Sequence, residues 1–313
     1  MTREREGLLL CLISAAGFGA MAIFAKQAYA AGLDVTTLLA LRFPMAAAML
    51  WALIALRRRA LGSLRGLIAG MVLGLVWYSG QAGLFFSSLE RIDAGLASLL
   101  LYAYPALVTL TAFALGRERL DRRRVVALGL ASTGVALVLA GGGTGEIDAL
   151  GAALALGAAV AYTVYILVSE RIGEHTPAVP FAASVCTGAA ITFAGAALVS
   201  GGIHASGEGV MWAAILASGS TVLPIVTFMA GLARVGPSTA SIASTVEPPF
   251  TVTLAWIVFG ETLGAVQLAG GALVLSAVVI LQARTPMWDS PGHGAPAQAT
   301  GPAPAREVVE DAA

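Results

Sequence analysis

Residues 248–263 read PPFTVTLAWIVFGETL, and residues 104–120 read YPALVTLTAFALGRERL. The two segments align with an offset of 144 residues, which pairs Pro105 with Pro249 and Gly116 with Gly260. Each is an apolar run that begins beside proline and ends at glycine followed within two residues by glutamate. The same offset pairs Gly7 with Gly151 farther toward the N-terminus. We interpret the matches as one structural unit that occurs twice in the chain.

The amino-acid composition indicates an integral membrane protein. Of its 313 residues, 58% are hydrophobic and 12% are charged, whereas soluble domains carry about 25% charged residues. A transmembrane helix needs about 20 predominantly apolar residues. Ten runs of that length are predicted as membrane spans, at 7–28, 36–56, 66–88, 94–115, 125–142, 149–169, 179–200, 210–233, 238–259 and 264–283. They leave no room for a soluble catalytic domain.

The predicted fold is therefore an all-α membrane protein with ten transmembrane helices in two five-helix repeats. Because five is odd, the second repeat enters the membrane from the opposite side, so the repeats have inverted topology. Fifteen of the 18 Lys and Arg residues fall in alternate loops and the termini, which predicts N-in and C-in by the positive-inside rule. The predicted divisions are a cytoplasmic N-terminus 1–6, repeats 7–142 and 149–283, a linker 143–148 and a disordered cytoplasmic tail 284–313.

Three segments carry a family resemblance: AKQAYAAGLDVTTLLALRFPMAA (25–47), the Pro105 span ending in GRERL, and EPPFTVTLAWIVFGETL (247–263). They resemble the EamA-like branch of the drug/metabolite transporter superfamily over about residues 8–283. The first unit departs from the family's Gly-Glu pair by inserting Arg117. The resemblance implies a multi-pass protein of the cytoplasmic (inner) membrane that moves small metabolites such as amino acids, often outward.

Ionisable groups at membrane depth are costly and mark candidate sites. Glu247 precedes Pro248 and Pro249 in the middle of the ninth span. It is a candidate contact for a substrate amine or a proton acceptor; alternatively, it caps the backbone at a helix break. Arg42 in the second span is a candidate contact for a substrate carboxylate, or it snorkels outward or pairs with an acidic group. Lys26 is interpreted as marking the outer interface.

Aromatic and amide side chains supply the remaining candidate substrate contacts. Trp77 and Gln81 are four residues apart and are expected to share a helix face. The other candidates are Tyr78, Tyr102, Tyr162, Tyr165 and Ser244. Tyrosine and tryptophan suit a pocket for zwitterionic or aromatic solutes, although both residues also anchor helices at membrane interfaces.

Prolines and glycines predict local backbone features. The candidate helix breaks are at Pro105, Pro224, Pro248 and Pro249, because proline removes a backbone donor. Gly66, Gly70 and Gly74 recur every four residues, and this spacing predicts close helix packing.

The sequence favours a secondary transporter that works by alternating access, with a small metabolite as its substrate. No ATP-binding motif is present, and neither a cofactor nor a metal site is expected. Protons are the candidate coupling ion and a homodimer is a candidate assembly, while a net charge of zero gives no bulk attraction to nucleic acid. A channel-like permease and an intramembrane enzyme are the alternatives, but the three histidines are dispersed over two loops and the tail.

Overall fold

The computed structural model describes residues 3–116, 121–141, 148–172 and 176–282. The described part is helical, and ten helices in it are long and apolar enough to span a membrane. The predicted all-α, ten-span fold is thus confirmed, and the chain is a multi-pass membrane protein. The predicted tail 284–313 lies outside the described residues, as does the predicted linker apart from Asp148.

Several spans consist of more than one helical segment. The first repeat comprises α1 (Arg3–Gly19), α2 (Met21–Ala30), α3 (Val35–Leu56), α4 (Leu64–Leu73), η1 (Gly74–Tyr78), α5 (Ser79–Leu89), α6 (Ala94–Leu101), α7 (Tyr104–Ala114) and α8 (Arg122–Ala140). The second comprises α9 (Ala149–Ile172), α10 (Ala178–Val199), α11 (Gly207–Ala217), η3 (Ser218–Val222), α12 (Leu223–Ser244), α13 (Glu247–Phe259) and α14 (Ala265–Gln282).

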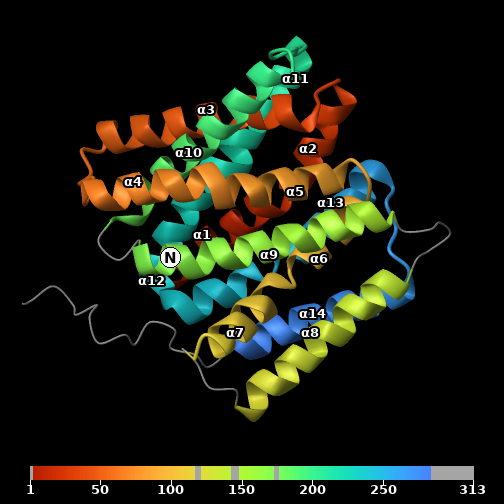
Figure 1. The fold of residues 1–313 in the computed structure, drawn as a ribbon. Coiled ribbons are helices and arrows are strands. Elements are labelled where there is room, and N and C mark those ends of the chain that lie inside the picture. The colour runs from red at the N-terminus through yellow and green to blue at the C-terminus, as the bar shows by residue number, and fades with distance from the viewer. Residues whose placement is uncertain (1–2, 117–120, 142–147, 173–175, 283–313) are drawn as a thin grey trace, which may run out of the picture.

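The two repeats interlock instead of forming separate domains (Figure 1). Helix α1 packs on α12, and its counterpart α9 packs on α5. Helix α3 packs on its own counterpart α10, and α8 packs on its counterpart α14 along one edge of the bundle. Exchanging the repeats therefore maps this packing pattern onto itself.

Local backbone features repeat with the offset seen in the sequence. The π-helical segments η1 and η3 begin at Gly74 and Ser218 and end at Tyr78 and Val222, which are 144 residues apart in both cases. Gly116 and Gly260 share this offset and have φ angles of 67° and 68°. A positive φ is readily adopted only by glycine, so the fourth and ninth spans are each followed by a glycine in the same left-handed region.

Capping residues explain why two spans begin earlier than predicted. The Asp121 side chain accepts a hydrogen bond from the Arg124 N–H, so α8 begins at Arg122 instead of residue 125. Ser206 caps α11 through the N–H of Gly209, so the eighth span begins at Gly207 instead of residue 210. Both are side-chain caps that satisfy a free N–H at a helix start.

The predicted glycine contact is confirmed where α4 and η1 pack on α10. A Cβ atom at Gly74 would overlap the Val185 carbonyl, and one at Gly188 would overlap the Met71 carbonyl. The two backbones approach each other closely because neither position carries a side chain.

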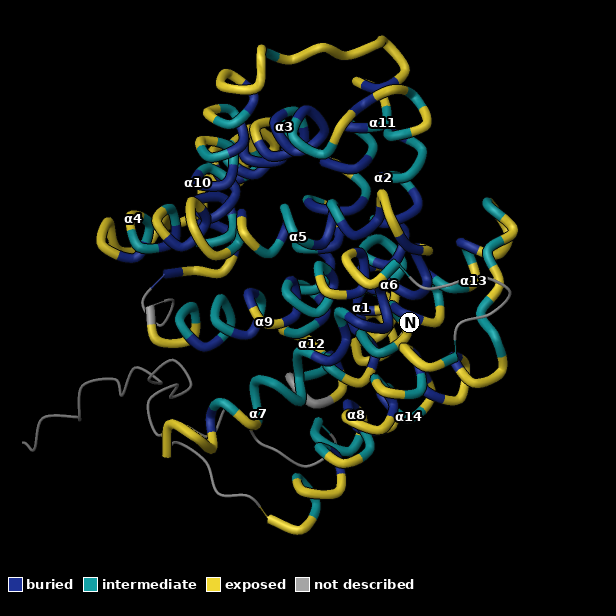
Figure 2. Tube along the Cα trace, turned by 45° about the vertical axis from the view of Figure 1, so that its right-hand side comes forward, coloured by how far each residue is buried: buried dark blue, intermediate teal, exposed yellow. Residues whose placement is uncertain are grey.

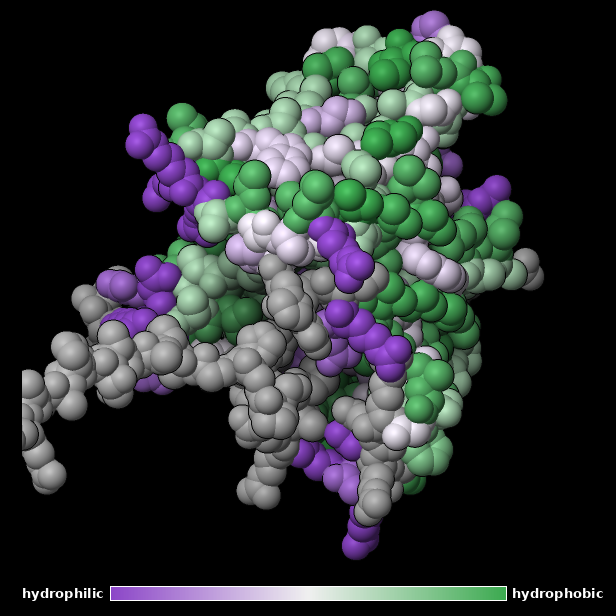
Figure 3. Space-filling view, turned by 60° about the vertical axis from the view of Figure 1, so that its left-hand side comes forward, coloured by the Kyte–Doolittle hydropathy of each residue, from purple (hydrophilic) through white to green (hydrophobic). Residues whose placement is uncertain are grey.

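The distribution of buried and apolar residues is that expected of a protein within a bilayer. Buried stretches lie toward the middle of the bundle in Figure 2, and exposed stretches lie on its periphery. Many exposed side chains are large and apolar, including Trp256, Ile257 and Val199. Figure 3 shows hydrophobic residues over the right-hand flank, and hydrophilic residues mostly over the left-hand, central and lower parts of the view. An apolar flank of this kind suits contact with lipid chains.

Candidate functional site

The breaks in the fourth and ninth spans come together inside the bundle. Helix α6 ends at Leu101 and α7 begins at Tyr104, while α12 ends at Ser244 and α13 begins at Glu247. The predicted break residue Pro105 lies in the first turn of α7, where a missing N–H costs no helical hydrogen bond. Pro248 and Pro249 occupy the same place in α13.

The first span is interrupted beside the same point. Helix α1 ends at Gly19 and α2 begins at Met21. The Thr251 hydroxyl of α13 donates to the Gly19 carbonyl at 2.8 Å, and a Cβ atom at Gly19 would lie 2.9 Å from the Glu247 carbonyl oxygen. Three interrupted spans therefore surround Glu247.

Glu247 is the first residue of α13 and is half-buried. The Tyr102 hydroxyl lies 3.0 Å from Glu247 Oε2 and 3.0 Å from the Ser244 carbonyl oxygen. A single O–H can fully donate to only one of these acceptors at a time. The Ser244 hydroxyl donates to the Ala240 carbonyl, so Ser244 takes part in the Tyr102 contact through its backbone.

A continuous row of aromatic rings leads away from Tyr102. Successive centroids are 5.8, 4.8, 5.8, 5.3 and 5.7 Å apart along Tyr102, Tyr104, Tyr162, Tyr165, Tyr78 and Phe43. These are ordinary separations for interacting aromatic pairs. We call these six residues the aromatic row. It draws on both repeats, because Tyr162 and Tyr165 belong to α9.

The row ends at Arg42, which is only 1% exposed. Its guanidinium carbon lies 4.9 Å from the Phe43 ring centroid and 5.0 Å from that of Phe86. Its Nε–H donates to Thr221 Oγ1 at 3.0 Å, and Nη2 lies 3.5 Å from the Met21 sulfur. Arg42 therefore does not snorkel outward, and no carboxylate within the described ranges forms an ion pair with it.

A buried cation with only neutral partners is expensive at membrane depth. The ring contacts and the Thr221 hydrogen bond stabilise the Arg42 cation, and an anion bound beside it would stabilise it further. Next to Thr221 in η3 lies Ser220, which is fully buried and whose hydroxyl has no hydrogen-bond partner among the residues described. The arrangement can bind a carboxylate near Arg42 and a positive or protonated group near Glu247.

The structure does not bring Trp77 to this row. Trp77 is 41% exposed on the bundle surface, whereas its neighbour Tyr78 faces Phe43 and Tyr165. Sequence spacing predicted one face for Trp77 and Gln81 because it assumed a regular α-helix. The π-helical turn η1 contains an extra residue, which changes the direction of the side chains within it. Gln81 is half-buried and lies in α5 beyond this turn.

Pro224 does not open a break of the same kind. It lies in the first turn of α12, directly after η3, and the chain remains helical across this junction. Its carbonyl accepts a hydrogen bond of 2.9 Å from the buried Ser14 hydroxyl of α1.

Sequence reasoning missed Phe43 and Met21 as members of the site. The repeat register could have indicated Met21, because Met21 is the counterpart of the predicted contact Tyr165 at the 144-residue offset. Equivalent positions of α2 and α9 thus contact Arg42 and the aromatic row, respectively. Thr221 lies 179 residues from Arg42, and no local pattern indicates that contact.

Lys26 links the repeats at one end of the bundle. Its ammonium lies 2.6 Å from Glu261 Oε1, while Glu261 Oε2 accepts a hydrogen bond of 2.8 Å from the Ala94 N–H at the start of α6. Both side chains are largely shielded from solvent. This end is the predicted outer side.

Comparison with known proteins matches both repeats to one family. The model of the EamA-like transporter family matches residues 5–140 and 149–282. The threonine/homoserine exporter RhtA of Escherichia coli K12 is 30% identical over 213 residues, covering 66% of this chain and 70% of that protein. RhtA of Salmonella typhimurium SL1344 is 30% identical over 200 residues, covering 63% of this chain, and the match spans 65% of the relative's length.

Two further similarities extend over more of the chain. A Bacillus subtilis protein described as an uncharacterized transporter, YcbK, is 24% identical, covering 84% of this chain and 88% of its own. A solved crystal structure has a TM-score of 0.63 at 20% identity and covers 88% of this chain and 96% of the matched one. The latter similarity concerns the fold alone.

Proposed function

The chain belongs to the EamA-like transporter family, and from that premise we propose that it is a secondary carrier that exports amino acids or similar zwitterions across the cytoplasmic membrane. The observation that carries the proposal is the buried Arg42, which has no ion-pair partner among the described residues. The RhtA relatives are named as threonine/homoserine exporters, which supports an amino acid as the substrate class.

In this proposal the carboxylate of the solute binds at one end of the aromatic row, and Glu247 lies at the other end of the solute's path. The Arg42 guanidinium binds the carboxylate, because its planar N–H groups match two carboxylate oxygens. Glu247 contacts an ammonium group at a different stage of transport from Arg42, or it carries a proton. The rings between them provide apolar surface with polar hydroxyl edges, which suits a small amphipathic solute.

Alternating access follows from the two repeats in the proposal. Binding residues come from both, since Arg42 is in the first and Glu247 in the second, so relative movement of the repeats changes which side reaches them. The Lys26–Glu261 ion pair joins the repeats at the predicted outer end. Its closure holds that end shut in this conformation, and its opening releases the solute outward.

Counterflow in proteoliposomes tests the proposal. Purified protein is reconstituted without ATP, the vesicles are loaded with unlabelled amino acids, and uptake of labelled L-threonine, L-homoserine and a wider panel is measured. A carrier shows transient accumulation that depends on the solute inside.

Flux that is independent of the internal solute would indicate a channel. A folded protein that moves none of the panel, or that chemically converts the solute, would contradict the proposal. Trp77→Leu provides a matched control, because this side chain lies outside the aromatic row.

A further inference from the structure

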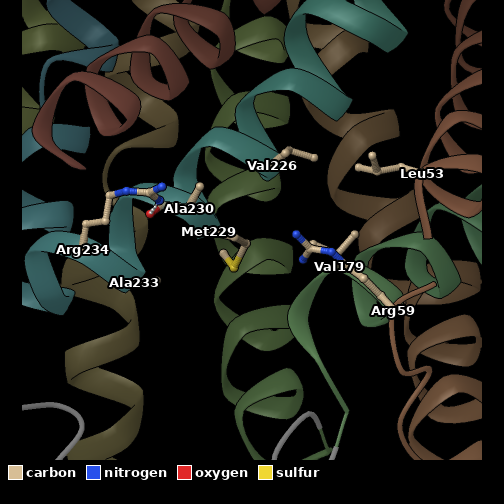
Figure 4. A pocket seen from close by; sticks show the side chains of 8 residues that line it. All are labelled: Leu53, Arg59, Val179, Val226, Met229, Ala230, Ala233 and Arg234. Atoms are coloured by element: carbon tan, nitrogen blue, oxygen red, sulfur yellow. Dashed lines mark hydrogen bonds between the residues drawn. The ribbon is translucent and has the colours of Figure 1, made fainter. Parts of the chain in front are cut away.

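A cavity of 350 Å³ lies apart from the aromatic row (Figure 4). Its walls come from the end of α3, the start of α10 and the second half of α12, with Leu53, Arg59, Val179, Val226, Met229, Ala230, Ala233 and Arg234 lining it. We call it the α3–α12 cavity. It lies toward the end of the bundle where α1 begins, since Gly7 packs against Arg234 and Val235. The arginine distribution predicts this end to be cytoplasmic.

Two positions of the cavity wall carry smaller side chains than their counterparts in the other repeat. The 144-residue offset makes Phe86 and Leu89 of α5 the counterparts of Ala230 and Ala233 of α12. Phe86 and Leu89 are 1% and 2% exposed and fill the equivalent position at the opposite end. At these two positions the second repeat carries alanines, which occupy less space.

The cavity carries two positive charges. Arg58, two residues after the end of α3, has a φ of 47°, a left-handed position that usually takes glycine. The resulting turn bonds the Arg59 N–H to the Ile54 carbonyl at 3.1 Å, and the Arg59 side chain points into the space between Val179 and Met229 (Figure 4).

Arg234 provides the second charge from the α12 wall. One N–H group of its guanidinium donates to the Ala230 carbonyl at 2.6 Å, which holds the side chain along the cavity. Neither Arg234 nor Arg59 forms an ion pair with a carboxylate of the described ranges. The counterpart of Arg234 in the first repeat is Glu90, so the charge is also reversed between the two ends.

The walls of the cavity continue toward Arg42. Val226 follows Thr221, the hydrogen-bond partner of Arg42, by five residues along one continuous helical path. That separation corresponds to a rise of about 7 Å. On the other wall, Leu53 and Arg42 both belong to α3. A solute in the cavity thus lies beside α3, which contains Arg42, and beside the helical path that contains Thr221.

We propose that the α3–α12 cavity is a separate, cytoplasm-facing binding site for the carboxylate of a small solute, which it holds before the solute reaches Arg42. Arg59 and Arg234 bind the carboxylate, and the aliphatic walls accept the carbon chain. The proposal rests on the carrier function, since the solute is the carried one. A lipid headgroup is a weaker fit, because the hollow is bounded by three spans of this chain and its size suits a small solute.

Cysteine labelling tests this site without requiring transport. Ala233→Cys places a thiol on the cavity wall, whereas the native Cys11 and Cys186 are buried. The full-length protein in nanodiscs of neutral lipid is reacted with the anionic reagent MTSES and the cationic reagent MTSET. We expect the MTSES/MTSET rate ratio to fall at least about threefold in Arg59→Gln and in Arg234→Gln, because each removes a local positive charge. Arg65→Gln, an exposed arginine outside the cavity, should leave the ratio unchanged.

Protection then identifies the ligand chemistry. L-threonine, used as the probe, should slow MTSES labelling, and the decarboxylated analogue 1-amino-2-propanol should not. Equal ratios in all three arginine variants, or equal protection by both probes, would overturn the proposal. Slowing only when anionic lipid is added would assign the cavity to a headgroup and also overturn it. Carboxylate-dependent protection in a protein that fails to show counterflow would support this site while rejecting the carrier function.

Discussion

The Lys26 ammonium and the Glu261 carboxylate form an ion pair of 2.6 Å between the two repeats. Glu261 also caps α6 through the Ala94 N–H, so the glutamate makes two contacts and the lysine one. Removing Glu261 leaves both a cation and a helix start without their partner, whereas removing Lys26 leaves the cap intact.

We therefore expect Glu261→Ala to lower the free energy of unfolding by about 1–3 kcal/mol more than Lys26→Ala does. Thermal unfolding of the detergent-purified variants measures the difference. The exchanged pair Lys26→Glu with Glu261→Lys restores attraction but not the cap, and should recover only part of the loss. Equal stability of the two single variants would contradict this account of Glu261.

Close helix packing predicts a strong effect at Gly74. In Gly74→Ala the new methyl group overlaps the Val185 carbonyl, so α10 must shift, and overpacking of this kind costs about 1–3 kcal/mol. Gly80→Ala is the matched control, because its methyl group would meet nothing within 4 Å and alanine favours helix. Thermal unfolding should show a lower midpoint for the first variant and an unchanged or higher one for the second. A tolerated Gly74→Ala would refute the contact.

The π-helical turn η1 predicts opposite results for adjacent residues. Tyr78→Leu interrupts the aromatic row and should lower transport, whereas Trp77→Leu alters the surface of the bundle and should not. Initial counterflow rates at equal amounts of folded protein provide the comparison. A lower counterflow rate in Trp77→Leu than in Tyr78→Leu would contradict the side-chain directions described for η1.

Asp148, which lies outside the membrane spans, predicts a dependence of stability on pH. The Gly151 N–H and then the Arg91 guanidinium hold the pKa of its carboxyl below its usual range. A lowered folded-state pKa contributes stability above the unfolded value, near about 3.9, and this contribution is lost as pH falls through the folded pKa. The unfolding midpoint of Asp148→Ala should lie below that of the native protein at pH 7, and the gap should narrow on acidification. A gap that widens would contradict the sign.

Sequence patterns predict the architecture better than the site. Span number and repeat register depend on apolar runs and on positions such as Pro105 and Pro249, which act locally. The site depends on contacts between distant residues, such as Arg42 with Thr221. The direction of Trp77 depends on η1, whose extra residue accompanies a hydrogen bond from the Ser79 hydroxyl to the Gly74 carbonyl and close packing on α10. Helical spacing contains no signal for such a turn.

The central claim is that Arg42 binds the carboxylate of the transported solute. The most direct measurement compares Arg42→Gln with the native protein in counterflow, using L-threonine and its decarboxylated analogue 1-amino-2-propanol. Loss of the buried charge should lower kcat/KM for L-threonine by about 100-fold and have a much smaller effect on the amine, so discrimination between the two solutes is lost. An equal loss for both solutes, or unchanged transport of L-threonine, would contradict the claim.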